Sequence, residues 1–369
     1  MKIALLSTGF LSGREATAIT LTDFSKELVE KNHKVTVFPE IRKSDLRHET
    51  RDGLEVYRIG SRKFRKLSFI NRILGHGLGL RKIQKKHEIK FDVIHGFSAA
   101  PILVLRTIFA KIFCRNAITV HTLKSYSREK MGQSFFGLLN GVDYVTVPSK
   151  RFARILENKG VKKNKIKIIR SHINTHKFKP RNKKELKEKY DISNRKIVLY
   201  YGSLWKMKGT DILLKAIPKI IQNDDNVQFI IASRHFPYPE EFQTVAKEYP
   251  NNIKLIDKIV NIEEYVSMAD AVVLPYHNLI GTEGNPSCLL EAMASKTAVV
   301  TTNLPELREI AENEVHMAKP SDVNSLTNTI LDVINHPNFE MLDKAYLKSQ
   351  EFSTEKISKQ FLELYQYKN

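Results

Sequence analysis

Short apolar runs rich in β-branched residues alternate along the chain with longer stretches whose apolar positions recur every three or four residues. The first pattern is typical of buried strands and the second of amphipathic helices. In the first half we predict strands at residues 2–7, 34–38, 56–59, 92–95, 117–121, 144–147 and 165–169. A helix is predicted over residues 18–31, with Asn32 as its left-handed cap. This alternation indicates parallel α/β architecture.

The pattern breaks near residue 180 and then starts again. Residues 179–184 are polar and are interpreted as a linker or its approach. A second series of strands is predicted at residues 196–201, 227–232, 253–256, 271–274, 298–302 and 315–318. The last helix is predicted to begin after Ser353, its N-cap, and to run to about residue 365. Its apolar stripe is expected to be Ile357, Phe361, Leu362 and Tyr365.

The two series of strands predict two doubly wound, Rossmann-like α/β domains, over residues 1–180 and 181–350. Ligands in open α/β sheets bind at the carboxyl ends of the strands, so we expect a cleft between two such edges. Residues 351–369 are expected to form a helix that packs back on the first domain.

Composition narrows the class of protein. The chain has 369 residues, 42% of them hydrophobic, which is typical of a globular protein. Only two cysteines, Cys114 and Cys288, are present, which argues against a disulfide framework or a zinc site and fits a reducing cytosol. No signal peptide is visible and no stretch of about 18 uncharged apolar residues exists, so we expect a cytoplasmic protein without a membrane span.

Charge divides the chain in two. Residues 1–190 carry 42 Lys and Arg against 16 Asp and Glu, a net charge of +26, whereas residues 191–369 carry 18 against 24, a net charge of −6. This asymmetry predicts an anionic partner for the first domain.

One basic stretch, residues 61–90, interleaves its cations with leucine, isoleucine and phenylalanine and has a net charge of +9. Such a mixture suits an anionic membrane surface, at the inner face of the cell membrane, or a lipid-linked acceptor; a solvated basic face is the alternative. The residues expected to make these contacts are Arg62, Lys63, Arg65, Lys66, Arg81, Lys82, Lys85 and Lys86.

Two segments of the second half suggest chemistry. Residues 202–209, Gly-Ser-Leu-Trp-Lys-Met-Lys-Gly, follow a predicted strand and precede a predicted helix. A glycine in such a turn lets the backbone approach a phosphate and a lysine supplies charge, although an ordinary βα turn with an exposed lysine has the same appearance.

The second segment, residues 283–291, has the sequence Glu-Gly-Asn-Pro-Ser-Cys-Leu-Leu-Glu. We predict a turn with Ser287 as the N-cap of a helix that starts at Cys288. The free N–H groups at residues 285–288 and the helix dipole would then favour diphosphate oxygens. Glu291 lies among apolar residues, and a buried carboxylate needs partners.

The spacing Glu-x7-Glu before Ala-Met-Ala, preceded by Gly-x-Leu-x3-Lys-Gly, resembles the retaining family-4 glycosyltransferases of GT-B fold. The resemblance extends to residues 142–149, 173–180, 268–275 and the closing helix, and so covers essentially the whole chain. It implies an acceptor-binding first domain and a nucleotide-sugar-binding second domain.

The resemblance also implies roles for individual residues. Glu283 would hold the transferred sugar, Glu291 the ribose and Lys208 the diphosphate, while His121 would contact the sugar and the reacting region. From its own context alone, a histidine such as His121 is more often a strand-end or core residue than a catalytic one. The complete expected donor site consists of Lys208, Glu291, Gly13, Gly202, Ser203, Gly284, Asn285, Pro286, Ser287 and Cys288.

Several positions depart from the family pattern. The usual arginine after Gly202 is Ser203, for which Lys206 is a candidate replacement, and the usual glycine after Ala-Met-Ala-x is Lys296. The aspartate that often follows the histidine is Thr122, and the common Asn-Gly pair is Ser171-His172. These departures concern the grip on the donor and leave the two glutamates and Lys208 in place.

The expected activity is therefore sugar transfer from a nucleoside-diphosphate sugar to a lipid-linked or glycan acceptor, with retention of anomeric configuration and without a metal cofactor. Two alternatives remain open at this stage. A basic membrane- or nucleic-acid-binding protein would account for the charge, although no nucleic-acid-binding motif is present. A sugar-nucleotide epimerase or a phosphorylase of the same fold would share the donor motif.

Overall fold

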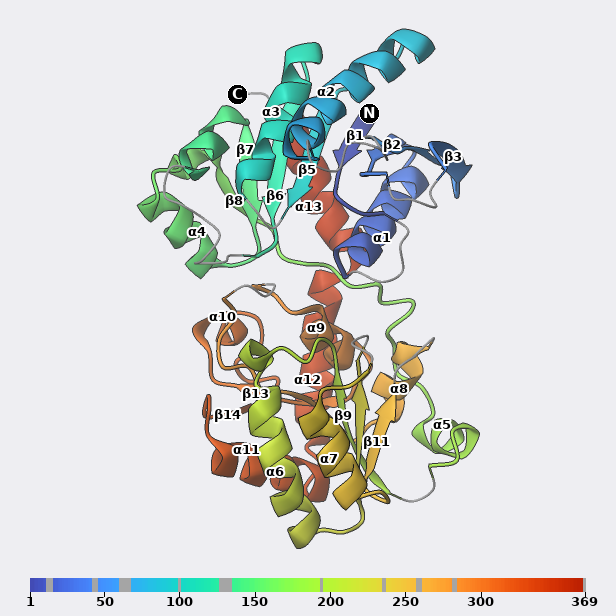
Figure 1. Cartoon of the computed structure of the whole chain (residues 1–369), viewed down its shortest axis with the longest axis vertical. Coiled ribbons are helices and arrows are strands. Elements are labelled where there is room, and N and C mark those ends of the chain that lie inside the picture. Colours follow the sequence, from blue (N-terminus) through green and yellow to red (C-terminus); the bar gives the residue numbers. More distant parts are fainter. Residues whose placement is uncertain are drawn as a thin grey trace. The chain divides into compact units, whose positions relative to one another are not determined.

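The computed structural model describes residues 1–10, 16–41, 46–59, 68–98, 101–125, 135–192, 195–233, 237–256, 261–280 and 284–367. The chain divides into two compact α/β units (Figure 1). Unit 1 comprises Met1–His172, Ile280–Gly284 and Thr354–Asn369, and unit 2 comprises Ile173–Leu279 and Asn285–Ser353. The fold class is confirmed as two Rossmann-like α/β units built on parallel sheets.

Within the described residues, unit 1 is built on an eight-stranded sheet in the order β3-β4-β2-β1-β5-β6-β7-β8. Every pairing is parallel except that of β3 with β4. The strands are β1 Lys2–Leu6, β2 Lys34–Phe38, β3 His48–Arg51, β4 Leu54–Tyr57, β5 Val93–Ser98, β6 Ile118–Leu123, β7 Tyr144–Val147 and β8 Ile166–Ile168. The helices are α1 Ala16–Glu30, α2 Ser68–His87, α3 Val104–Phe113, α4 Lys150–Asn158 and α13 Thr354–Gln366, with short 3-10 turns at Pro101–Leu103, Gly137–Gly141 and Lys163–Lys165.

The described part of unit 2 holds a six-stranded parallel sheet in the order β11-β10-β9-β12-β13-β14. Its strands are β9 Lys196–Tyr201, β10 Val227–Ala232, β11 Ile253–Ile256, β12 Ala271–Leu274, β13 Ala298–Thr302 and β14 His316–Ala318. The helices are α5 Lys183–Lys189, α6 Thr210–Asn223, α7 Glu240–Glu248, α8 Ile262–Met268, α9 Ser287–Ala294, α10 Pro305–Arg308, α11 Val323–Asn335 and α12 Phe339–Ser349, with 3-10 turns at Lys206–Lys208 (η5) and Gln350–Phe352.

Strand β9 explains why unit 2 has two apolar layers. Its residues are almost entirely buried, and successive side chains point to opposite faces of a sheet. Leu199 and Tyr201 accordingly pack in one cluster, with α9, and Val198 and Tyr200 in the other, with α6. Both faces of the sheet are therefore covered by helices, as parallel sheets require.

The strand order also fixes where a ligand can approach each sheet. In unit 2, β9 pairs with β10 on one side and with β12 on the other, so the connections leaving β9 and β12 diverge there. In unit 1 the equivalent switch lies between β1 and β5. Ligand-binding crevices form at the carboxyl ends of strands at such switch points, so a ligand site in unit 2 is expected at the turns after β9 and β12.

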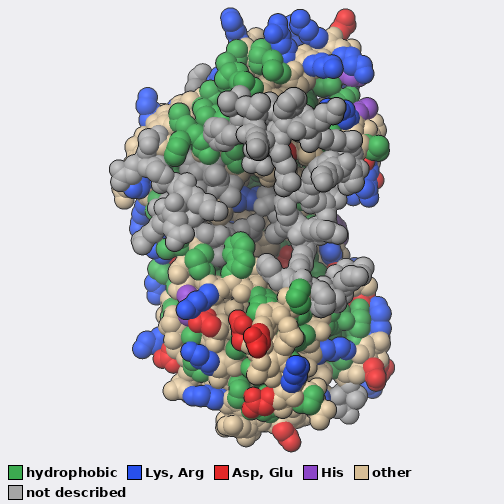
Figure 2. Space-filling view, viewed as in Figure 1, with side chains coloured by type: hydrophobic (Ala, Val, Ile, Leu, Met, Phe, Trp, Pro, Cys, Tyr) green, Lys and Arg blue, Asp and Glu red, His purple; other side chains and the backbone are tan. Residues whose placement is uncertain are grey.

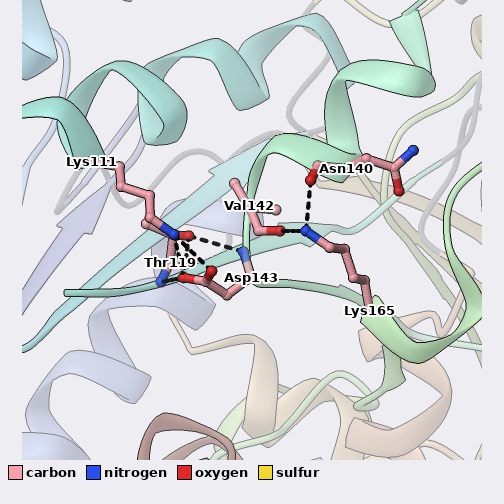
Figure 3. A network of polar contacts seen from close by, with 6 residues as sticks. All are labelled: Lys111, Thr119, Asn140, Val142, Asp143 and Lys165. Carbon is pink, nitrogen blue, oxygen red and sulfur yellow. Dashed lines mark hydrogen bonds and ion pairs between the residues drawn. The ribbon is translucent and has the colours of Figure 1, made fainter. Parts of the chain in front are cut away.

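The opposite, amino-terminal ends of the sheets are closed by aspartates that directly precede a strand. Asp143, before β7, accepts hydrogen bonds from Thr119 N (2.8 Å) and Thr119 Oγ1 (2.7 Å) and pairs with Lys111 (Figure 3). In unit 2, Asp270 accepts a hydrogen bond from Ile197 N (2.8 Å) and pairs with Lys187 at 2.9 Å. Each carboxylate accepts a hydrogen bond from a backbone N–H at the start of a neighbouring strand, which stabilises the amino-terminal end of the sheet.

The closing helix α13 belongs to unit 1, where it packs beside α1. The rings of Phe361 and Phe24 are 5.1 Å apart, and the hydroxyl of Tyr365 lies 2.5 Å from Nδ1 of His95 on β5. The predicted stripe is correct at Ile357, Phe361 and Tyr365, but its fourth buried member is Leu364, because Leu362 is only half-buried.

The division between the units falls at residues 172 and 173, eight residues before the predicted boundary at 180. Ile173 donates its N–H to the carbonyl of Phe352 (2.9 Å), and both residues pack in the core of unit 2 together with Phe178. The segment just before the predicted linker, residues 173–178, therefore contributes to the core of unit 2 and not to the first domain.

Two further differences concern secondary structure. The hairpin strand β3 was not expected, because its sequence, His-Glu-Thr-Arg, has no apolar residue to signal a strand. Strands β5 and β6 run to Ser98 and Leu123, which places His121 inside a strand instead of at its end. Asn32 adopts a left-handed φ of 62° after α1, as predicted.

Candidate functional site

The turn that follows β9 is the first part of the candidate site. Gly202 has a φ of 142°, and the carbonyl of Ser203 accepts a hydrogen bond of 2.6 Å from the hydroxyl of Tyr200. The chain then forms the 3-10 turn η5 and reaches Gly209, which has a φ of 73° and precedes α6. These residues form a backbone turn at the carboxyl end of β9.

Gly209 fixes this turn against the turn that follows β12. A Cβ atom on Gly209 would lie 1.6 Å from the carbonyl oxygen of Pro275, so only glycine fits. One residue beyond Tyr276, the N–H of His277 donates to the carbonyl of Met207 at 3.1 Å. The two turns at the switch point of unit 2 are therefore in direct backbone contact.

Lys208 is the cation of this turn. Its side chain is half-buried and its ammonium nitrogen lies 5.6 Å from the centroid of the Tyr276 ring, a cation–π distance. Within the described residues, no carboxylate forms an ion pair with Lys208. Lys206, the candidate replacement for the arginine missing at Ser203, is exposed. Lys208 is thus a half-buried positive charge for which the described residues supply no negative partner.

His277 braces the same edge and was not identified from the sequence. Its Nε2 lies 2.7 Å from Oδ1 of Asp211, in the first turn of α6, and its Nδ1 lies 2.6 Å from Oγ of Ser321, beyond β14. One imidazole therefore ties together three loops at the carboxyl edge of the sheet. The three residues are distant in sequence, and only the strand order brings them together.

Helix α9 provides the second wall of the site. Its first residue is Ser287, so the prediction of Ser287 as N-cap is wrong: the cap position is Pro286, which gives no side-chain cap hydrogen bond. Proline is preorganised to lead into a helix but offers the first turn no acceptor. The N-cap residue itself therefore places no side-chain acceptor on the backbone N–H groups of α9, and the helix dipole favours an anion at this end of the helix.

Glu291 is held from the end of β9. Its Oε2 accepts a hydrogen bond of 2.8 Å from the hydroxyl of Tyr201, which also lies 3.1 Å from the carbonyl oxygen of Cys288. Burial, followed by the neighbouring Glu291 carboxylate, raises the pKa of Tyr201 well above its ordinary value. Tyr201 is therefore always protonated, and it connects the carboxylate of Glu291 to β9.

The segment before α9 is tightly enclosed. Asn285 is 0% exposed and Pro286 is buried, whereas Ser287 and Cys288 are half-buried. Gly284 belongs to unit 1, where its N–H donates to the carbonyl of Lys124 at 3.4 Å. The predicted site residues Glu283, Gly13, Arg62, Lys63, Arg65 and Lys66 lie outside the described residues.

His121 lies in the interior of unit 1, on β6. Its Nε2 is 2.8 Å from Oγ of Ser98 and its Nδ1 is 3.0 Å from Oγ1 of Thr107 on α3, so both ring nitrogens are hydrogen-bonded. Burial, followed by the charge of Arg106, lowers the pKa of His121 to about 3. In this arrangement His121 is a neutral core residue, as its own context allowed.

Helix α2 carries the predicted basic face. Arg81, Lys82, Lys85 and Lys86 are all exposed along its outer side, and the guanidinium of Arg81 lies 5.3 Å from the centroid of the Phe113 ring on α3. Leu78 and Ile112 are each 54% exposed beside them. Figure 2 shows hydrophobic side chains next to Lys and Arg in the region of these two helices. We call these residues, on α2 and α3, the basic face.

Two kinds of feature are absent from the described residues, a metal-binding cluster and a membrane-spanning helix. No group of three or more His, Cys, Asp or Glu side chains there is arranged to hold a metal ion. None of the helices in the described segments is both long and apolar enough to cross a membrane.

Comparison with known proteins places both halves of the chain. Residues 195–336 match the family described as glycosyl transferases group 1, and residues 17–177 match glycosyltransferase family 4. The GPI3 subunit of phosphatidylinositol N-acetylglucosaminyltransferase from Saccharomyces cerevisiae is 21% identical, over 98% of this chain and 82% of its own length. The phosphatidyl-myo-inositol mannosyltransferase of Mycobacterium leprae is 28% identical over 38% of each chain.

A solved structure shows the same fold. Anabaena HepE, in complex with UDP and glucose, superposes with a TM-score of 0.77 at 18% identity and covers 99% of both chains. The two family matches together span most of the chain, and the structural likeness spans nearly all of it. This chain therefore belongs to the glycosyltransferases of GT-B fold, in the group 1 and family 4 lineage.

Proposed function

We propose that this glycosyltransferase transfers a sugar from a nucleoside-diphosphate sugar to a lipid-linked or glycan acceptor at an anionic membrane surface, with retention of anomeric configuration. The observation that carries the donor assignment is the pairing of two features at the carboxyl end of β9. One is Lys208, a half-buried cation with no carboxylate partner among the described residues, and the other is the N-terminus of α9, where the positive end of the helix dipole lies and where Pro286 is the N-cap residue.

The chemistry of these features suits a diphosphate. A phosphate requires hydrogen-bond donors and positive charge, which the N–H groups of α9 and the ammonium of Lys208 supply. Glu291, fixed by Tyr201, accepts hydrogen bonds and suits the two hydroxyls of a ribose. The related fold of HepE, solved with UDP and glucose, supports a uridine nucleotide as the first donor to test.

In the proposed reaction, negative charge develops on the leaving diphosphate while positive charge develops on the sugar. Lys208 and the α9 dipole stabilise the first charge without a metal ion. Glu283 holds the transferred sugar, as the family resemblance implies. Hydrogen-bond donors and charges that are already in position need no reorganisation during the reaction. A fixed turn and a fixed helix are therefore suited to stabilise the leaving diphosphate.

The basic face supports an acceptor that is anionic or embedded in an anionic membrane. Four exposed cations and two exposed aliphatic side chains on α2 and α3 provide both electrostatic attraction and apolar contact. The names of the yeast and mycobacterial relatives reported above describe transferases of phosphatidylinositol and of phosphatidyl-myo-inositol. We therefore propose a glycolipid acceptor and peripheral attachment to the cytoplasmic side of the membrane.

Transfer is tested with labelled UDP-glucose, UDP-N-acetylglucosamine and GDP-mannose, using vesicles that contain phosphatidylinositol as the acceptor. We expect labelled lipid from one donor, insensitivity to a metal chelator, and a retained anomeric configuration by NMR of the product. Glu283→Ala should abolish transfer without changing the thermal midpoint. Turnover close to that of the unmodified protein in this variant, or an inverted product, would contradict the proposal.

Membrane attachment is tested by vesicle flotation with and without phosphatidylglycerol. A triple variant of the basic face, Lys82→Glu with Lys85→Glu and Lys86→Glu, should lose binding, because each basic residue near an anionic surface contributes about 1 kcal/mol. The matched control reverses three exposed lysines in and just before β8, at one edge of the sheet, and should bind nearly as before; they are Lys162, Lys163 and Lys167. Equal loss in both variants would show that only net charge matters.

A further inference from the structure

The segment that leads into α9 contains a buried polar side chain, that of Asn285, which is 0% exposed. Among the residues that the structure describes, neither its Oδ1 nor its Nδ2 has a hydrogen-bond partner. A buried carboxamide with no partner is costly, because the group has lost its hydrogen bonds to water and gained none. Native proteins contain few such groups, and each requires a reason.

The position of Asn285 suggests that reason. It lies two residues before Ser287, the first residue of α9, and so on the side of the helix N-terminus away from Glu291. If the ribose is held near Glu291 and the diphosphate at the first turn of α9, the next part of the donor in that direction is the sugar.

The chemistry of the side chain narrows the class of ligand further. A carboxamide offers one acceptor oxygen and two N–H donors, and a phosphate, which only accepts, leaves the oxygen unpaired. A sugar hydroxyl both donates and accepts, so two neighbouring hydroxyls, or one hydroxyl and an acetamido group, satisfy the whole amide.

We propose that the carboxamide of Asn285 is a specificity-determining group that binds hydroxyl or acetamido substituents of the transferred sugar. The inference rests on the proposed donor site and adds to it a side-chain contact with the sugar. The described part of the apo protein offers this amide no hydrogen-bond partner, and the correct donor supplies one. A donor without the matching substituents leaves the amide unpaired, which is how a buried polar group discriminates between otherwise similar ligands.

The substitution Asn285→Leu tests this inference, because leucine has a similar size and needs no hydrogen bonds. We expect the thermal midpoint of the apo variant to equal or exceed that of the unmodified protein, since an unpaired buried group is removed. By calorimetry with the pairs UDP and UDP-glucose, UDP and UDP-N-acetylglucosamine, and GDP and GDP-mannose, the variant should bind the free diphosphate unchanged. Its affinity for the matching sugar nucleotide should fall by about tenfold or more.

Gln228 on β10 provides the matched control. Its Oε1 is also buried and has no hydrogen-bond partner in the described part of the chain, but Gln228 lies near the amino end of the sheet, next to Ile197 of β9 in register. Gln228→Met should leave the affinities for both members of each pair unchanged. This comparison separates loss of a buried amide in general from loss of this particular one.

Three outcomes would overturn the inference. Sugar nucleotides that bind Asn285→Leu as tightly as they bind the unmodified protein would show that the amide does not contact the sugar. A loss of affinity for the free diphosphate as well would assign the amide to the nucleotide. Failure of the unmodified protein to bind any of the diphosphates would overturn the donor site itself, and this inference with it.

Discussion

The hydroxyl of Tyr201, the last residue of β9, lies 2.8 Å from Oε2 of Glu291 in α9. This hydrogen bond crosses from the carboxyl end of the central strand to the helix beside it, and the same hydroxyl reaches the carbonyl of Cys288 at 3.1 Å. One oxygen of the carboxylate that we propose to bind the ribose is therefore held by the last residue of a sheet strand.

Removing this hydroxyl should weaken nucleotide binding. In Tyr201→Phe, Glu291 loses a hydrogen bond that restrains it, and we expect the affinity for UDP to fall by about three- to tenfold. The control Tyr190→Phe removes the same kind of bond, from Tyr190 to Glu264 (2.6 Å), between α5 and α8. Calorimetry should show unchanged UDP affinity in the control, and equal affinities in the two variants would argue against the role of Tyr201.

Gly209 should be intolerant of any side chain. The Cβ of Gly209→Ala would lie 1.6 Å from the carbonyl oxygen of Pro275, in addition to the strain of a φ of 73°. The turns after β9 and β12 must then separate, at a cost of about 3 kcal/mol or more. Gly160→Ala is the control, because its φ is 85° but nothing lies within 4 Å, and it should cost only about 1 kcal/mol. Denaturant unfolding measures the loss of unfolding free energy in both variants. Equal losses would mean that the turn after β12 moves away from residue 209 at little energetic cost.

Asp143 should stabilise unit 1 less as the solution becomes acidic. Burial raises the pKa of its carboxyl, but hydrogen bonds from Lys111 and Thr119 outweigh this and the net shift is downward. The stabilisation is therefore complete above the ordinary pKa of about 3.8 and is lost as the pH falls through the lowered value. At pH 7, Asp143→Asn should lower the unfolding free energy by about 1–2 kcal/mol, and the difference should shrink below pH 4.

The control for Asp143 is Asp52→Asn, which removes an exposed ion pair with Lys26 and should have no measurable effect. A difference between Asp143→Asn and the unmodified protein that stays constant from pH 7 to pH 3 would show that the charge of Asp143 is not responsible.

Three buried histidines of unit 1 should make the fold acid-sensitive at a higher pH. Burial lowers the pKa of His121 to about 3, of His172 to about 4, and of His95 well below its ordinary value of 6.5. Above pH 6.5 these histidines are neutral in both states and contribute nothing to the pH dependence. Below it only the unfolded chain takes up protons, so stability falls by up to about 1.4 kcal/mol per pH unit for each histidine.

Unfolding midpoints measured between pH 7 and pH 4.5 test this behaviour. His121→Gln should reduce the slope of the unfolding free energy against pH by about 1.4 kcal/mol per pH unit, which corresponds to one proton. This change in slope does not depend on how the substitution alters stability at pH 7. A slope unchanged by the substitution would mean that His121 is protonated in the folded protein, and would restore it as a candidate acid or base.

The positions of the strands in unit 2 were predictable because each is a short, continuously buried run, such as Val-Gln-Phe-Ile-Ile-Ala in β10. The Glu-x7-Glu spacing and the lysine before Gly209 could likewise be recognised, because each motif consists of residues that are close together in the sequence. What could not be predicted depends on contacts between distant segments. His277 meets Asp211 and Ser321 only because the strand order brings three loops to one edge.

One local expectation, that of Ser287 as the N-cap of α9, is wrong. Serine is a favoured N-cap, but here Pro286 takes that position and Ser287 begins the helix. Lys296, which stands where the family has glycine, accepts a left-handed φ of 53° and places its ammonium 2.5 Å from Asp343, on α12. At this position, where the family has glycine, the lysine therefore adds an ion pair between the end of α9 and α12.

The contribution of Lys208 to the affinity for a nucleoside diphosphate tests the proposed donor site most directly. Calorimetry with UDP, GDP and ADP should reveal one preferred nucleotide for the unmodified protein. Lys208→Met should weaken its binding by about 2 kcal/mol or more, about 30-fold in Kd, while the corresponding monophosphate loses less. The control Lys215→Met, an exposed lysine of α6, should bind normally. If Lys208→Met binds the diphosphate as tightly as the unmodified protein, Lys208 does not hold the diphosphate and the proposed site is wrong.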